Sequence, residues 1–162
     1  MVRRWIRFVA ALGFVVATCS VAGAQRGVSQ ATESFVIGPG ITGAWNDPSQ
    51  SGHGLFIEVL PDNRFYASWF AFNLAGTEQS WFTGVGTYSG NTASIAAVEQ
   101  PAGGRWIPDF DANRVVHNPW GTLTFTFSDC DHGKVEFSSV AGYGAGSMNL
   151  TRLTQPARLS CQ

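Results

Sequence analysis

The chain has 162 residues, of which 13% are charged, and its 10 lysines and arginines against 11 aspartates and glutamates give a formal net charge of −1. This balance leaves no basic surface of the kind that binds nucleic acid. With 19 glycines, 12 phenylalanines and 6 tryptophans, the composition is typical of a β-rich domain with many turns and leaves little material for amphipathic helices.

Residues 1–24 have the form of a secretory signal peptide. Three arginines precede an apolar run from residue 8 to 17, and Ala22-Gly23-Ala24 is a small-residue cleavage site. The apolar run is too short to cross a bilayer permanently. We therefore predict cleavage after Ala24 and a periplasmic or secreted protein without a stable membrane span. Seven basic residues then remain against 11 acidic ones, a net charge of about −4. The alternative is a lipoprotein anchored through Cys19.

Export also determines the state of the cysteines. Once Cys19 leaves with the signal peptide, Cys130 and Cys161 remain as a pair in an oxidising compartment. We predict a disulfide between them, with two free buried thiols as the alternative. Two distant cysteines without paired histidines do not match a zinc site, so we expect no metal here. No motif in the sequence indicates a cofactor.

Strand signals follow one another after a polar lead-in at 25–40, which we predict to be flexible. Alternating apolar residues and intervening turn residues predict strands at 41–45, 54–60, 64–72, 77–83, 85–89, 92–99, 120–128 and 147–154, with a further apolar face at Val135 and Phe137. The clearest alternation is at 120–128, where Leu123, Phe125 and Phe127 share one side and three threonines share the other.

Short consecutive strands joined by tight turns favour an antiparallel up-and-down meander. About eight such strands are enough to close a barrel and remove its edges. We therefore predict an all-β fold in which residues 41–162 form a single barrel-like domain, with a β-sandwich as the alternative. The exception is the stretch 100–119, where an irregular connection is predicted by Pro101, Gly103, Gly104, Pro108 and Pro119.

Four segments carry a resemblance to a known family. They read GAWNDPSQSGHG at 43–54, WFAFNLAG at 69–76, WGTLTFTFSDC at 120–130 and GYGAGSMNLTRLT at 142–154. Through them the chain resembles a family of short exported proteins and C-terminal modules of Gram-negative bacteria, most of which have no assigned activity. The resemblance implies a shared fold and not a shared reaction. The opening Gly-Ala-Trp is also similar, over a short stretch, to the lipocalin and avidin group of ligand-holding barrels.

Polar side chains give a weaker functional signal. His53, with Asp47 and Glu58 close by in the sequence, has the residue types of an acid and base set or a metal site. We favour the alternative that His53 is a loop histidine and Glu58 a solvent-facing strand residue. Likewise, the acidic stretch 129–132 is predicted to be a turn stabilised by its aspartates. Ser51 lacks the strand-to-helix setting of a hydrolase nucleophile. We predict neither an enzyme nor a metal site.

The aromatic residues are the stronger lead. An indole ring offers a flat stacking surface and one hydrogen-bond donor, which suits apolar molecules and sugars. We therefore predict ligand-binding residues at an opening of the barrel, namely Trp45, Trp69, Trp81, Trp106, Trp120 and His53, with core packing as the alternative for most of them. Trp106 stands apart because it lies in the irregular stretch, where its ring either caps the barrel or stays exposed.

The expected function is a non-enzymatic binding module for a small apolar molecule or a glycan. The alternative is a protein-binding envelope factor, such as an inhibitor of a hydrolase, that uses residues 100–119 as an insertion; an enzyme with a site near His53 is a third reading. A ligand-holding barrel should contain a pocket lined by tryptophans, an inhibitor should have a filled interior and a protruding loop, and an enzyme needs converging polar groups in a cleft.

Overall fold

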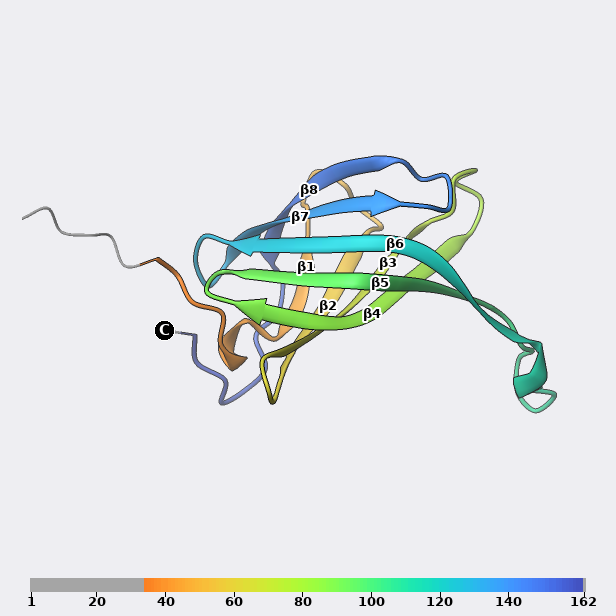
Figure 1. Ribbon diagram of the computed structural model, residues 1–162, viewed down its shortest axis with the longest axis horizontal. Helices are drawn as coiled ribbons and strands as arrows, with labels where there is room; N and C mark the ends of the chain where they lie inside the picture. Colours follow the sequence, from red (N-terminus) through yellow and green to blue (C-terminus); the bar gives the residue numbers. More distant parts are fainter. Residues whose placement is uncertain (1–33, 162) are drawn as a thin grey trace, which may run out of the picture. The chain divides into compact units, whose positions relative to one another are not determined.

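A computed structural model describes residues 34–161. They form eight antiparallel strands in one closed barrel, in which each strand pairs with its neighbours in the sequence and the last pairs with the first (Figure 1). The predicted all-β meander is thereby confirmed. Within these residues no helix has the length and apolar character needed to cross a bilayer. The predicted signal peptide and Cys19 lie outside the described residues.

The strands lengthen toward the middle of the chain. They are β1 (Gly43–Asn46), β2 (Gly54–Leu60), β3 (Arg64–Phe72), β4 (Gln79–Ser89), β5 (Thr92–Gly103), β6 (Val115–Phe127), β7 (His132–Ser139) and β8 (Ala145–Arg152), with two 3-10 helices, η1 (Pro39–Ile41) and η2 (Ala112–Arg114). The barrel closes through a short strand pairing, because β1 pairs with β8 only at Trp45 with Arg152 and at Asn46 with Thr151.

The barrel interior is filled with side chains along most of its length. Successive strand residues point to opposite faces, so the alternation read in β6 buries Leu123, Phe125 and Phe127 and leaves the intervening threonines facing outward. Phe65 from β3 meets Phe125 with 5.0 Å between ring centroids. The core therefore consists of aromatic and branched side chains in contact, as in small closed barrels generally.

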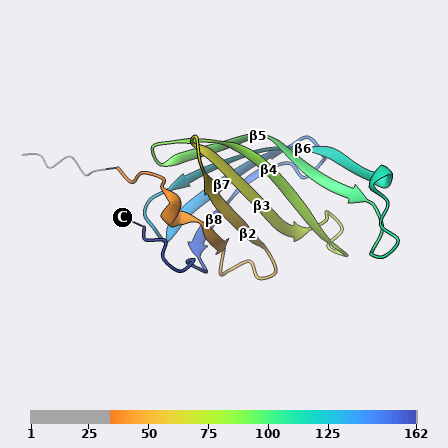
Figure 2. The same ribbon diagram turned by 90° about the horizontal axis from the view of Figure 1, so that it is seen from below.

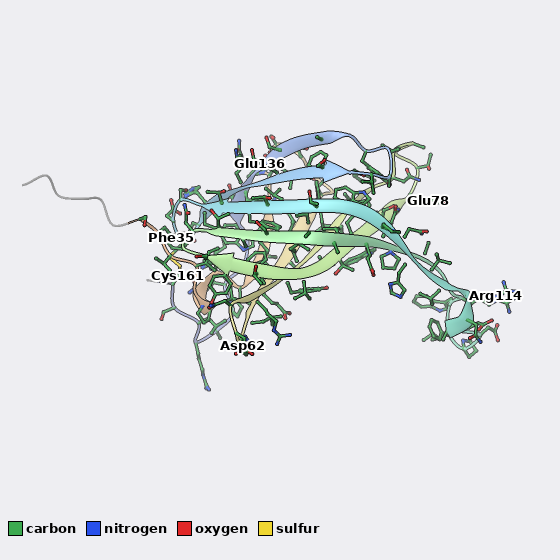
Figure 3. All side chains as sticks on the ribbon, in the orientation of Figure 1. Phe35, Asp62, Glu78, Arg114, Glu136 and Cys161 are labelled. Atoms are coloured by element: carbon green, nitrogen blue, oxygen red, sulfur yellow. A yellow bond between two sulfur atoms is a disulfide. The ribbon has the colours of Figure 1, made fainter. Side chains whose placement is uncertain are left out.

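Up-and-down connectivity sends alternate connections to opposite ends. The connections 47–53, 73–78, 104–114 and 140–144 lie at one end, which we call the mouth, and the turns 61–63, 90–91 and 128–131 lie at the other, which we call the base. Figure 3 shows Glu78 at the mouth, whereas Phe35 and Cys161 lie at the base.

The base is closed by both ends of the described chain. Ile37 is 3% exposed and its amide donates a hydrogen bond to the carbonyl oxygen of Gly90 at 2.8 Å. Gly40 lies so close to Ser160 and Cys161 that a Cβ would overlap their backbone. Residues 34–40, which the sequence places in a flexible lead-in, therefore pack against the barrel, because Ile37 and the following η1 supply side chains to its core.

The predicted disulfide is confirmed. Cys130, in the turn between β6 and β7, bonds to Cys161 with a Cα–Cα distance of 5.8 Å. The bond fixes the C-terminal tail against the base.

The stretch 100–119 differs from the prediction. Strands β5 and β6 continue as a two-stranded arm that projects beyond the barrel (Figures 1 and 2), with pairs running from Glu99 with Pro119 to Gly103 with Val115. Only the tip, residues 104–114, is irregular. The prolines are tolerated because each strand of the arm has one unpaired side, where a missing N–H breaks no ladder bond.

Candidate functional site

A cavity of about 170 Å³ opens at the mouth of the barrel. Its walls are mainly aromatic and come from β3, β4, β6, β7 and the loop before β8; they consist of Trp69, Phe72, Phe82, Trp120, Phe137 and Tyr143. The register pairs Trp69 directly with Phe82, and the rings of Trp120 and Phe137 lie 6.0 and 5.5 Å from that of Trp69, so these four rings meet at the mouth.

Small residues in β8 create the space. At the mouth end β8 begins Ala145-Gly146-Ser147, so no large side chain enters the barrel there above Met148. The ring of Phe137 lies over Gly146, where an added Cβ would come within 2.9 Å of it. The cavity therefore lies beside the mouth end of β8. There β8 contributes only small side chains, whereas the other strands still contribute large ones.

The walls hold one another in place. Trp120 lies 4.6 Å from Phe82, 5.8 Å from Tyr143 and 6.0 Å from Trp69, measured between ring centroids. Trp69 in turn lies 5.5 Å from Phe137 in an edge-to-face arrangement. Rings packed at these distances support one another and resist rotation, so the pocket is largely formed before any ligand enters.

Two hydrogen-bond donors in the pocket walls lack partners. Trp69 is 6% exposed and Trp120 is 1% exposed, and within residues 34–161 neither indole Nε1 has an acceptor. The Nδ1 atom of His53, a third lining residue, is also buried without a partner among those residues. An unpaired buried polar group costs about 1 to 3 kcal/mol, so a bound molecule that accepts hydrogen bonds from these donors would offset that cost.

Trp45 shows the contrasting case. It is fully buried toward the base, and its Nε1 donates to the carbonyl oxygen of Ile41 at 3.0 Å. The guanidinium group of Arg152 lies 5.3 Å from its ring centroid, and a ring-to-ring distance of 5.2 Å separates it from Phe127. The indole N–H of Trp45 therefore has its hydrogen-bond partner within the core, and the residue lies outside the pocket.

The structure separates the predicted ligand-binding residues into groups. Trp69, Trp120 and His53 come together in the pocket, whereas Trp45 belongs to the base. Trp81 is 49% exposed on the outer face, where it packs against Phe70. Trp106 is 86% exposed at the tip of the arm.

Four aromatic lining residues were not anticipated from the sequence. Phe72, Phe82, Phe137 and Tyr143 join the two tryptophans in the walls. The alternation at Trp81-Phe82 already predicts opposite faces for these neighbours, and Phe82 is the buried one. That signal gives the direction of a side chain but not its height along the barrel.

The polar residues near His53 do not form a catalytic set. Asp47 accepts hydrogen bonds from the amide and hydroxyl of Ser49, at 2.9 and 2.7 Å, and from Gln50. These bonds, that from the Ser49 side chain first, lower the pKa of the Asp47 carboxyl. Glu58 is exposed on the outer face of β2. His53 instead lies against Phe72, with 5.5 Å between ring centroids.

The acidic turn at 128–131 is stabilised by its own backbone. Asp129 accepts hydrogen bonds from the amides of Asp131 and His132 at 2.7 and 2.8 Å. The bond from the Asp131 amide is the main reason that the pKa of Asp129 lies below its usual value. Across residues 34–161 no three histidine, cysteine or acidic side chains are grouped as a metal ion would require.

Comparisons with protein-family models, with curated proteins and with solved structures find no match to this chain. The family resemblance drawn from the sequence segments stays a prediction.

Proposed function

We propose that the protein is a non-enzymatic binding module that holds a small, largely apolar ring molecule in the mouth pocket. The ligand carries a hydrogen-bond acceptor that meets the indole N–H groups of Trp69 and Trp120. One observation supports this proposal above all others, namely two buried and unpartnered donors in the walls of a preformed aromatic pocket. The signal peptide predicted from the sequence and the disulfide support a location in the periplasm or outside the cell.

The size of the pocket limits the ligand. An apolar protein cavity of roughly 150 Å³ holds one benzene molecule, and this cavity measures about 170 Å³. It therefore suits one six-membered ring with a short substituent, and any longer part of the molecule must leave through the mouth. A ring stacked on Trp120 and Phe82 replaces water at an apolar surface, which supplies most of the binding free energy.

The hydrogen-bond acceptor of the ligand determines which ring molecules bind tightly. A ring without one fills the pocket and leaves both indole donors unpaired, whereas a carbonyl or carboxylate oxygen pairs with them. Sites built in this way discriminate against analogues that lack the bonding atom. Gln50, His53 and Ser147 are the other polar residues of the lining. This is a small polar set for a sugar, whose hydroxyl groups need many partners, so we favour an apolar ring over a glycan.

Acetophenone and ethylbenzene form a matched pair of probes, because they share the ring and differ in the carbonyl oxygen. For a ligand of this size we expect acetophenone to bind with a Kd on the order of 0.1 mM in calorimetry. Ethylbenzene should bind about tenfold more weakly, the value of one good hydrogen bond.

The variant Trp120→Phe keeps an aromatic wall and removes one donor. It should reduce the difference between the two probes, whereas Trp81→Phe, on the outer face, should leave it unchanged. Equal affinity for both probes in the wild-type protein would refute the role of the donors. Binding of N-acetylglucosamine with no binding of acetophenone would move the proposal to glycans.

A further inference from the structure

The tip of the arm exposes large apolar side chains. Trp106 is 86% exposed, Ile107 68% and Phe110 58%. Contiguous apolar surface of this kind on a soluble protein usually marks a place where something binds. Leu74 and Val140, in two other mouth connections, are 65% and 78% exposed, so apolar surface is concentrated at this end of the barrel.

The tip has a defined conformation. The amide of Gly104 donates to the carbonyl oxygen of Arg114, and that of Asp109 donates to the carbonyl oxygen of Trp106, each at 3.1 Å. The carboxylate of Asp111 accepts from the amide of Asn113 at 3.0 Å and lies 3.4 Å from Arg114 Nε. A preformed tip loses little conformational entropy when it binds, so its apolar surface is available for recognition.

The arm and the pocket belong to the same end of the barrel. The connection between β5 and β6 is one of the four mouth connections, and Figure 3 shows Arg114 at the end of the arm with Glu78 at the adjacent barrel end. Pro119, at the foot of the arm, directly precedes Trp120 of the pocket wall. One end of the molecule therefore carries both a projecting aromatic group and a concave aromatic site.

We propose that two copies of this chain associate through their mouths, with Trp106 of each copy inserted into the pocket of the other. A two-fold axis makes such an exchange reciprocal: if the tip of one copy reaches the second pocket, the second tip reaches the first. This arrangement closes the assembly at two copies and covers both the exposed tips and the pockets.

The tip of one copy matches the mouth of the other in size and chemistry. The pocket accommodates one six-membered ring, which is the outer ring of an indole. The tip is neutral overall, with two arginines against two aspartates, and Arg105 directly precedes Trp106 in the sequence. The other three mouth connections carry two carboxylates, Asp47 and Glu78, and no lysine or arginine. A tip approaching a second mouth thus brings Arg105 toward acidic groups.

The buried area is also sufficient. A fully buried large aromatic side chain removes roughly 150 to 250 Å² from water, so Trp106 and Phe110, together with the smaller Ile107, bury on the order of 400 to 500 Å² from each copy. Each copy buries its own mouth as well, since it receives the tip of the other. The total per copy then approaches the roughly 800 Å² that is usual for a specific interface.

This inference goes beyond the proposed ligand and does not depend on it. The two are linked in one respect: a small ring in the pocket and an inserted Trp106 exclude each other. A ligand that binds the pocket therefore dissociates the dimer, because it binds the free mouth only.

Sedimentation velocity of the purified protein over a concentration series tests the association. We expect the wild-type protein to pass from monomer to dimer in the micromolar range. Trp106→Ala removes two central indoles per dimer and should raise the dissociation constant at least about 100-fold. Leu153→Ala, which removes an apolar side chain that is 65% exposed and lies outside the mouth connections, is the matched control and should change nothing.

A mixing experiment separates tip-to-pocket contact from tip-to-tip contact. Ala71 lines the cavity, so Ala71→Phe fills it from within, and an unchanged thermal midpoint checks that the variant is folded. Alone, Ala71→Phe should be monomeric, like Trp106→Ala. Mixed, the two variants should form a dimer with one intact contact.

Two results would overturn the inference. One is a wild-type protein that stays monomeric up to about 1 mM, because an interface of this size should associate at lower concentrations than that. The other is a dimer that persists in Trp106→Ala.

Discussion

Replacement of Trp45 by phenylalanine separates the base of the barrel from its mouth. Trp45 is fully buried, and its indole N–H donates to the carbonyl oxygen of Ile41. If this residue serves the core rather than a ligand, Trp45→Phe should destabilise the fold and leave the pocket intact.

The magnitude follows from two losses. The Ile41 carbonyl loses its buried donor, which costs about 1 to 3 kcal/mol. The smaller ring leaves a space beside Phe127 and Arg152, which costs about 1 to 2 kcal/mol more. We therefore expect Trp45→Phe to lower the free energy of unfolding by about 2 to 5 kcal/mol, with an unchanged slope against urea concentration.

Equilibrium urea unfolding followed by circular dichroism measures this change, and calorimetry with acetophenone measures the pocket. The control is Trp81→Phe, because Trp81 is 49% exposed on the outer face and its replacement should stay within about 0.5 kcal/mol. Equal stability of the two variants, or a Trp45→Phe variant that keeps its stability and loses the ligand, would contradict a core role for Trp45.

Three further predictions concern the fold. Phe125→Ala should cost about 3 to 5 kcal/mol in urea unfolding because it empties a fully buried site, whereas Thr124→Ala, facing outward, should stay within about 0.5 kcal/mol; equal losses would contradict the register of β6. Cys161→Ala opens a disulfide that spans 31 residues and should cost about 3 to 4 kcal/mol, measured against the oxidised wild type, and no loss would show that the tail holds without it. The pKa of Asp129 is lowered in the fold, so its contribution to stability is present above its usual pKa and lost as the pH falls through the lower folded value; Asp129→Asn should flatten the acid limb of a stability–pH profile, and an unchanged limb would count against this carboxyl.

The sequence predicted the barrel well because its strongest signals are local. Alternation in β6 follows from the two-residue period of a strand, and Leu123, Phe125 and Phe127 are buried as that period requires. Tight turns between short strands left few topologies other than a meander. The disulfide followed from the pair of cysteines that remained after the predicted signal peptide.

Two stretches were misread because their local composition is compatible with more than one structure. Prolines and glycines at 100–119 predict an irregular connection, but a two-stranded arm accepts Pro101 and Pro119 on its unpaired sides. Gly103, with φ of +79°, needs glycine because a Cβ would overlap the carbonyl oxygen of Arg114. Residues 34–40, the described part of the predicted lead-in, pack against the barrel because Ile37 is buried and its amide donates to Gly90.

The pocket depends on contacts between distant strands. Trp69, Phe82, Trp120 and Phe137 come from four different strands, and only the closed barrel brings their rings together in one lining. The cavity itself results from small residues in β8, such as Gly146, that carry no functional signal in a sequence. For this reason the sequence singled out the tryptophans as a class but did not indicate which of them share a site.

The most direct test of the pocket is the proton–nitrogen spectrum of the tryptophan side chains during a titration with acetophenone. Single Trp→Phe variants assign the indole Nε1–H signals of the five tryptophans within residues 34–161. We predict that the signals of Trp69 and Trp120 move downfield together as the carbonyl oxygen accepts their hydrogen bonds, while the signals of Trp45 and Trp81 stay in place. Unchanged signals from Trp69 and Trp120 in the presence of bound acetophenone, or a shift confined to Trp81 or Trp106, would contradict the proposed site.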